Sequence, residues 1–155
     1  DVGNFGRDPE GRELLNEAPT VKLEGSSERH IRVGESLNLA ASAADDSMPE
    51  VKPAPQGRPG SPRSRSNALG LRVAWHIYRG DGSKVNFVPP QFKIYPDYRL
   101  NSNSPWSPGW EPPALPEHGR FPVTATFTEP GTYVVRVLAH DGGLTDHRDV
   151  HVTVR

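Results

Sequence analysis

The chain has 155 residues, a formal net charge of −1, no cysteine, 17 prolines and 15 glycines. Proteins that bind nucleic acids usually carry an excess of basic residues that contact the phosphates. This chain has no such excess, so we expect no nucleic-acid partner. Without cysteine there is no disulfide, thiol nucleophile or cysteine-ligated metal, and no apolar run approaches the roughly 18 residues of a transmembrane segment. Because the chain opens on Asp1 without a signal-peptide core, we expect a processed protein or a fragment.

Residues 1–17 are too polar for a core, so we expect an extended linker or docking segment there, followed by one domain over residues 18–155. Short segments that alternate apolar and polar residues are typical of half-buried strands. They predict strands at 20–23, 31–33, 36–43, 71–78, 84–88, 123–128, 132–140 and 149–154. Turn signals at 80–83 and 129–131 predict a hairpin between 71–78 and 84–88 and a tight turn before 132–140. Seven or eight short strands predict an all-β fold, an antiparallel β-sandwich.

The prolines divide the chain into regions. Fourteen of the 17 lie in residues 49–62 and 89–122. Because proline lacks an N–H and fixes φ, neither stretch is expected to hold a central strand or a helix interior. The sequence therefore predicts two long proline-rich insertions, 46–70 and 89–122, between the strands of a modest sandwich.

Several segments resemble the PKD and related Ig-like extracellular domains of bacteria. The resemblance is carried by residues 16–21 (NEAPTV), 33–39 (VGESLNL) with 43–46 (AADD), 71–75 (LRVAW), and 129–135 (EPGTYVV) with 139–143 (AHDGG). It covers about half of the chain, and both insertions depart from a minimal PKD domain. The resemblance implies a secreted, periplasmic or cell-surface module, often one of several in a larger protein, that mediates adhesion, spacing or partner binding rather than catalysis.

An Ig-like strand order also predicts where the insertions lie. Connections 44–70, 89–122 and 141–148 would share one pole of the sandwich, the pole that carries the variable loops in antibodies. The opposite pole would keep only the tight turns at 80–83 and 129–131. Functional residues concentrate on loops that a rigid scaffold holds in place. We therefore expect the pole with the insertions to be the functional surface.

The two insertions differ in composition. Residues 49–70 are basic and nearly free of bulky apolar side chains, which is typical of a solvated loop; alternatively, they form a basic arm for an acidic partner, with Arg58, Arg63 and Arg65. Residues 89–122 hold half of the aromatic residues. They either fold back over the sandwich end as a small core or expose anchors for a protein or a sugar ring, namely Tyr95, Tyr98, Trp106 and Trp110.

Three carboxylates are expected to meet at the same pole: Asp45, Asp46 and Asp141. Clustered hard oxygen ligands between sandwich loops suit Ca²⁺. The alternative is that these side chains cap turns through hydrogen bonds to the backbone. We therefore expect either no cofactor or a calcium ion at these aspartates.

No other motif predicts chemistry. His147 and His151 lie four residues apart on a predicted strand, about 13 Å, too far to chelate one metal. The tripeptide Arg79-Gly80-Asp81 is explained by its turn. No HExxH or GxSxG motif occurs, so we expect no enzyme.

One sheet face is a second candidate surface. The outward positions of the strands at 71–78, 132–140 and 149–154 include Tyr78, Val134 and Leu138, which are more apolar than a solvated face usually is. They predict a docking patch, or cover from an insertion. The same face carries Ala74, His76, Arg136, His140 and His151.

The expected function is a non-catalytic extracytoplasmic interaction or structural module. Its partner would be a protein, or the rest of a larger protein or envelope assembly. The alternatives are a carbohydrate-binding module that uses the aromatic residues of 89–122, and an accessory subunit that docks on a membrane complex through residues 1–17.

Overall fold

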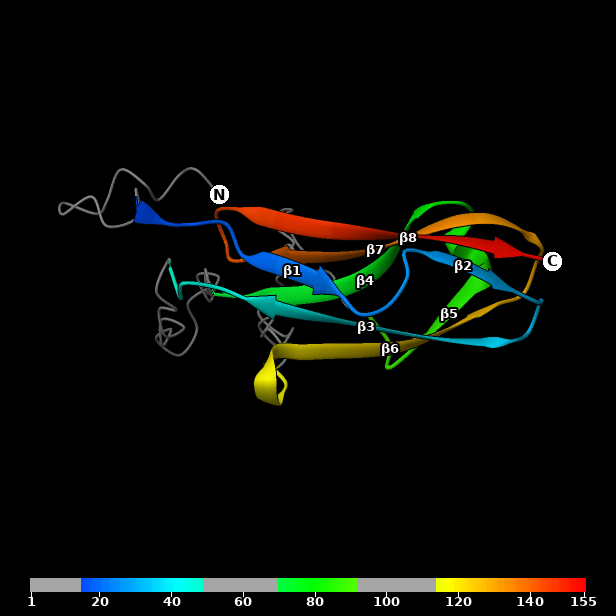
Figure 1. Ribbon diagram of the computed structural model, residues 1–155, viewed down its shortest axis with the longest axis horizontal. Coiled ribbons are helices and arrows are strands. Elements are labelled where there is room, and N and C mark those ends of the chain that lie inside the picture. Colours follow the sequence, from blue (N-terminus) through cyan, green and yellow to red (C-terminus); the bar gives the residue numbers. More distant parts are fainter. Residues whose placement is uncertain (1–14, 49–69, 92–113) are drawn as a thin grey trace, which may run out of the picture.

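The computed structural model describes residues 15–48, 70–91 and 114–155. Eight strands and two short 3₁₀ turns make up its regular structure (Figure 1). The strands are β1 (Thr20–Leu23), β2 (Glu28–Ile31), β3 (Ser36–Ala44), β4 (Arg72–Arg79), β5 (Val85–Val88), β6 (Arg120–Phe127), β7 (Gly131–His140) and β8 (Thr145–Val154). The 3₁₀ turns are η3 (Gly82–Lys84) before β5 and η4 (Glu117–Gly119) before β6.

The strands form two four-stranded sheets, β1-β3-β6-β5 and β2-β8-β7-β4. Every pair is antiparallel except β2 with β8, which is parallel. This is the strand order of an immunoglobulin constant-type sandwich, with the first strand divided between the two sheets. The all-β, Ig-like sandwich predicted from the period-two segments is confirmed.

The predicted hairpin between β4 and β5 is wrong. β5 pairs with β6, from Val85 opposite Phe127 to Val88 opposite Thr124, and so belongs to the other sheet. The ladder of β4 is irregular between Ile77 and Arg79, and the Asp81 carboxylate then accepts hydrogen bonds from the N–H and hydroxyl of Ser83. The predicted turn is present, but it connects β4 of one sheet to β5 of the other instead of joining two neighbouring strands.

The expectation that residues 89–122 contain no strand is wrong at their end, because β6 begins at Arg120 and includes Pro122. Pro122 lies opposite Ala40, whose carbonyl accepts a hydrogen bond from the N–H of Glu24, the residue that follows β1. The backbone polar groups of Ala40 therefore point away from Pro122, so this is a non-hydrogen-bonded pair. The nitrogen of Pro122 faces the other edge, where β5 has already ended, and the missing N–H costs no ladder bond.

The core lies between the sheets and is built by alternate residues of the strands. Trp75 of β4 is 2% exposed, and its Nε1–H donates to the carbonyl of Phe121 at 3.1 Å. Tyr133 of β7 packs on Phe127 with ring centroids 4.9 Å apart. Its hydroxyl donates back to the carbonyl of Glu129 at 3.1 Å, the corner found in Ig domains. Valine occupies position 135, where antibody domains have their second cysteine.

The molecule is elongated, and the described chain enters and leaves at opposite ends (Figure 1). β3 and β7 end at the pole where β1, β4, β6 and β8 begin. The opposite pole holds the turn before β5, the turn before β7 and the C-terminal Arg155, whose carbonyl accepts the N–H of Val33. Within the described ranges, no helix has the length and apolarity needed to cross a bilayer.

Candidate binding pole

The loop pole is defined here as residues 15–19, 45–48, 70–71, 114–119 and 141–144. These are both described ends of the first insertion, the described residues of the second insertion that precede β6, the loop between β7 and β8, and the segment before β1. The connection after β5 returns to β6 here through η4, and Gly119 of η4 approaches the carbonyl of Ala43 at the end of β3 so closely that a Cβ would lie 2.6 Å from it. The predicted convergence on one pole is therefore confirmed for residues 46–48 and 70 of the first insertion and 114–119 of the second. The start of the second insertion lies beside β4 instead, where Gln91 accepts the N–H of Trp75.

Asp141 is the centre of the loop pole. Its side chain is fully buried. One carboxylate oxygen accepts the N–H groups of Gly143 and Leu144, each at 2.6 Å, and the other accepts the Asn16 amide at 3.0 Å. Its backbone carbonyl accepts the N–H of Gly70 at 2.7 Å. One residue thus joins three segments that are far apart in the sequence.

Two further aspartates bind the chain where it enters the sandwich, one just before β1 and one within β1. The Asp46 carboxylate accepts the N–H of Glu17 at 3.0 Å and that of Met48 at 2.9 Å. The Asp146 carboxylate accepts the N–H of Val21 at 2.8 Å and the guanidinium of Arg148 at 2.7 Å. Burial would raise the pKa of Asp146, but these hydrogen bonds outweigh it and hold the pKa below its usual value.

Next to Asp141 lies a second buried pair, Arg72 and His140. Both side chains point to the outside of their sheet, yet they are only 2% and 7% exposed. The His140 ring nitrogen Nδ1 accepts the N–H of Gly142 at 2.8 Å. Burial and the positive charge of Arg72 lower the pKa of His140 to about 4, so the ring is neutral at pH 7.

The three aspartates of the predicted calcium site are brought close together, but each of them accepts hydrogen bonds from backbone N–H groups in its own turn. Asp45 accepts the N–H of Ser47 at 3.0 Å, as Asp46 does that of Met48. Among the described residues, no group of three or more histidine, aspartate or glutamate side chains is arranged to hold a metal ion. The turn-capping alternative accounts for most of the contacts.

Two oxygens at this cluster are not accounted for by turn capping. Oδ1 of Asn16 and Oδ1 of Asp45 are buried, and neither has a hydrogen-bond partner among the described residues. Burial raises the pKa of Asp45, and the negative charges of Asp141 and Asp46 add to that rise. Sequence reasoning did not single out Asn16 as a ligand, although it lies in the segment 16–21 that carries the family resemblance.

The predicted partner-binding side chains cannot be placed against this geometry. They lie outside the described residues: Arg58, Arg63, Arg65, Tyr95, Tyr98, Trp106 and Trp110. Their assignment, and with it the carbohydrate-binding alternative, stays a prediction.

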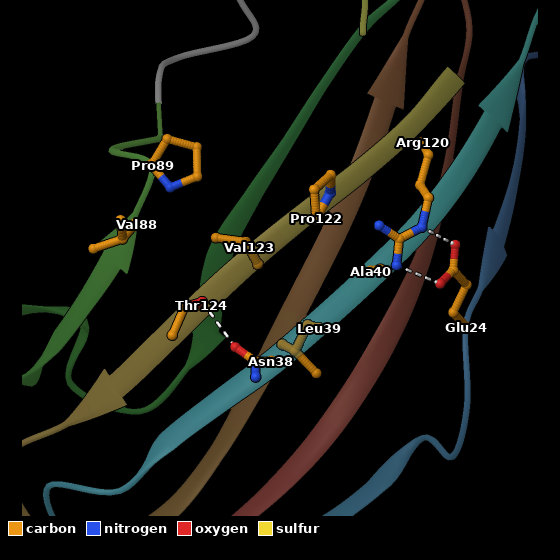
Figure 2. Close-up of a pocket in the computed structure, with 10 residues that line it drawn as sticks. All are labelled: Glu24, Asn38, Leu39, Ala40, Val88, Pro89, Arg120, Pro122, Val123 and Thr124. Carbon is orange, nitrogen blue, oxygen red and sulfur yellow. Dashed lines mark hydrogen bonds and ion pairs between the residues drawn. The ribbon is translucent and has the colours of Figure 1, made fainter. Parts of the chain in front are cut away.

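An open groove lies on the outer face of β3 and β6, beside the end of β5 (Figure 2). Its volume is about 430 Å³. Ala40 and Pro122 form an apolar floor. The polar side chains around it are already paired, Asn38 with Thr124 at 2.8 Å, and Glu24 with Arg120 through two contacts of 2.8 Å. We assign no ligand to this groove, because no unpaired polar group in it would select one.

Comparisons with known proteins identify no family for this chain. No protein-family model matches the chain, and no curated protein matches its sequence. Similar solved structures include domains 4 and 5 of the S-layer protein SbsC, with 10% identity, a TM-score of 0.42, and coverage of 87% of this chain and 50% of that one. The chain thus spans about half the length of that structure.

Two further similar structures are an adhesin and a lipoprotein. The adhesin InvE of Yersinia pseudotuberculosis has 10% identity and a TM-score of 0.42, over 87% of this chain and 31% of that one. A conjugative transposon lipoprotein of Bacteroides eggerthii has 12% identity and a TM-score of 0.46, over 86% and 95%.

Proposed function

We propose that the chain is a non-catalytic extracytoplasmic module that binds a protein partner through its loop pole, within a larger protein or an envelope assembly. The observation that carries the proposal is the loop pole itself. The carboxylates of Asp141, Asp46 and Asp146 accept hydrogen bonds from the entering chain and so fix it to the bases of the loops. Loops on such a scaffold are where binding concentrates.

Two further features support this function. The sequence resembles bacterial PKD and Ig-like extracellular domains, which implies a secreted, periplasmic or cell-surface location. The described chain also enters at the loop pole and leaves at the opposite pole (Figure 1). That geometry suits a module that works in series with others along one polypeptide.

A pair of matched photo-crosslinking sites tests the proposal. Leu144 at the loop pole is 40% exposed, and Val33 at the opposite pole is 43% exposed. A photoreactive amino acid at either position is therefore equally accessible. In native cells, we expect a discrete protein adduct from position 144 and none from position 33. Equal labelling at both positions, or adducts from position 33 alone, would contradict the proposal.

As a second candidate function, we propose that the loop pole also binds Ca²⁺. Oδ1 of Asn16 and Oδ1 of Asp45 support it, because both are hard ligands that are buried without a hydrogen-bond partner in the part of the chain that the structure describes. Asp45 lies near the carboxylates of Asp46 and Asp141, and Asn16 contacts that of Asp141. Oδ1 of Asn16 and Oδ1 of Asp45 would bind the ion, and its charge would offset the repulsion among the nearby carboxylates of Asp45, Asp46 and Asp141 and stiffen the entering segment.

Thermal unfolding of chelator-treated protein tests this site. A ligand that binds only the folded state, at about 100 times its dissociation constant, adds roughly 2.7 kcal/mol of stability. We expect a higher Tm in millimolar Ca²⁺ and no increase in the Asp45→Asn variant. Asp81→Asn, at the opposite pole, is the control and should keep the response. An unchanged Tm of the parent protein in Ca²⁺ refutes the site.

A further inference from the structure

The edges of the two sheets differ in length. Among the described strands, β1 and β5 lie at the edges of one sheet, and β2 and β4 lie at the edges of the other. β1, β2 and β5 have four residues each, whereas β4 has eight. The outer N–H and C=O groups of an edge strand have no neighbouring strand, and a long edge is a template for another chain. The β4 edge is therefore where an additional strand fits best.

The three short edges are protected against such pairing. In β1, the N–H of Val21 donates to the Asp146 carboxylate at 2.8 Å. In β2, the hydroxyl of Ser26 accepts the N–H of Glu28 and donates to its C=O, both at 3.1 Å. β5 is followed by two prolines, which cannot donate to a ladder. Short strands, side-chain caps and prolines are the usual means by which proteins close sheet edges.

The hydrogen bonds of β7 show which groups of β4 face outwards. The N–H of Asp141, next to the end of β7, donates to the C=O of Leu144 on the β8 side. Successive residues of a strand direct their backbone groups to opposite sides, so the odd-numbered residues of β7 bond β8 and the even-numbered ones bond β4. Even-numbered residues of β4 lie opposite even-numbered residues of β7. Val73, Trp75 and Ile77 therefore direct their N–H and C=O groups to the free edge.

A side chain from the start of the second insertion holds one of these groups. Oε1 of Gln91 accepts the N–H of Trp75 at 2.8 Å, and Nε2 of Gln91 donates to the C=O of Pro89 at 2.8 Å. The side-chain amide of glutamine carries the same donor and acceptor groups as a peptide bond. Gln91 thus stands where the C=O of a neighbouring strand would stand, which shows that a peptide group fits against this edge.

The accessible part of the edge is the second half of β4. The first four residues of β4 are buried, the next two are half-buried, and Tyr78 and Arg79 are exposed. Among the described residues, none bonds the C=O of Trp75 or the N–H and C=O of Ile77. Three backbone groups in the accessible part are therefore available to a strand, and the N–H of Trp75 becomes a fourth when Gln91 is displaced.

The outer face of this sheet is a weaker candidate than its edge. The apolar docking patch expected from the sequence is not supported by burial, since Val134 is only 7% exposed and Leu138 is half-buried. Tyr78, at 47%, is exposed next to the edge. The guanidinium of Arg136 stacks on its ring, 3.5 Å from the centroid, and so fixes the ring in place. A rigid aromatic ring beside the free backbone groups adds apolar contact area for a strand at this edge.

We propose that the β4 edge, from Trp75 to Arg79, binds an extended segment of a partner protein as an additional strand of the sheet β2-β8-β7-β4. Backbone hydrogen bonds to Ile77 and to the C=O of Trp75 provide the affinity. The occupant is a protein segment because the edge offers peptide donors and acceptors that recur about every 7 Å, the repeat of a strand. This edge is not part of the loop pole, so the two proposals stand or fall independently.

Amide hydrogen exchange of the intact chain tests whether the edge is free. We expect the protection factor of the Ile77 amide to be at least about tenfold below that of His76, whose N–H faces β7. Gln91→Ala should lower the protection of the Trp75 amide, whereas Gln91→Glu, which keeps an acceptor oxygen, should retain it. Equal protection of Ile77 and His76 in the parent protein would show that the edge is already covered, and would overturn the proposal.

A displayed library of random peptides, each about ten residues long, is the probe for binding. We expect selected peptides to protect the Ile77 amide. Methylation of alternate backbone nitrogens should weaken binding at least about tenfold in the register that faces β4, and little in the other register. Gln91→Ala should bind these peptides about fivefold more tightly, because the hydrogen bond from Trp75 to Gln91 no longer has to be broken. Gln91→Glu is the matched control and should keep the parental affinity.

Four outcomes of the peptide experiment would overturn the proposal. The first is a library that yields no binder. The second is a set of peptides that tolerate methylation in both registers. The third is binding that leaves the Ile77 amide unprotected. The fourth is dimerisation of Gln91→Ala in sedimentation without peptide binding, which would assign the edge to a second copy of this chain.

Discussion

His140 is an imidazole that the fold keeps neutral. Its pKa is lowered from 6.5 to about 4, first by burial and then by Arg72. Between these values the unfolded chain binds more protons than the folded one, so the free energy of unfolding must fall as the pH drops from 6.5 towards 4. With allowance for solvent screening, we expect His140 to contribute about 2 kcal/mol to this loss.

Asparagine at position 140 isolates this contribution. The Asn Oδ1 can accept the N–H of Gly142 as the ring nitrogen does, but it does not titrate. We expect His140→Asn to flatten the pH dependence measured by urea unfolding at about pH 7 and about pH 4.5. His118→Asn is the matched control, since asparagine tolerates the positive φ of 62° at that position. If His140→Asn leaves the pH dependence of the free energy of unfolding unchanged, groups other than His140 cause that dependence.

Gly80 is required by both its backbone and its neighbour. Its φ is +100°, and a Cβ would lie 2.6 Å from Cδ1 of Tyr133. Tyr133 cannot move away without giving up its contact with Phe127 and its hydrogen bond to Glu129. We expect Gly80→Ala to lower the free energy of unfolding by about 3 kcal/mol.

Gly34→Ala separates the backbone effect from the clash. Gly34 has a similar positive φ of +79° but no heavy atom within 4 Å of a built Cβ. We expect a loss of about 1 kcal/mol there. Equal losses for the two variants in urea unfolding would show that the Tyr133 contact is unimportant.

At the scale of elements, β6 shows how a strand accommodates proline. The nitrogen of Pro122 faces an edge that β5 does not reach, whereas Thr124, two residues on, lies opposite Val88 of β5. We expect Pro122→Thr to change stability by less than about 0.5 kcal/mol. The exchange Thr124→Pro removes a ladder donor and the hydrogen bond to Asn38, and should cost about 3 kcal/mol. Similar Tm values for the two variants would contradict this register.

The elements were largely predictable, and their pairing was not. Alternation placed β1 at Thr20–Leu23 and most of β3, β4 and β7, because half-buried strands expose and bury every second residue. β2 was predicted at 31–33 and lies at Glu28–Ile31, and the first residues of β8 were missed. Alternation says nothing about which strand is the neighbour, so β5 was placed beside β4.

At the scale of the whole molecule, the core is drawn from the strands. Among the described residues, the central cluster has 16 members, and all of them lie in β1, β3, β4, β6, β7 and β8. We therefore expect a chain in which short Gly/Ser linkers replace residues 49–69 and 92–113 to fold. Flexible linkers change the entropy of loop closure only slowly with length. Cooperative thermal unfolding and a retained near-ultraviolet signal from Trp75 are the readouts. Loss of both would show that the insertions are part of the core.

The sequence by itself determined the all-β class, the approximate strands and the pole to which both insertions return, because these follow from local alternation, proline chemistry and a common strand order. Only the tertiary structure decided the rest. It placed β5 in the sheet of β6, buried Arg72 and His140 at outward positions, and left Oδ1 of Asn16 and of Asp45 buried without hydrogen-bond partners among the described residues. It also brought the side chain of Gln91 to the free edge of β4. Such features depend on contacts between residues far apart in the chain, which local patterns do not encode.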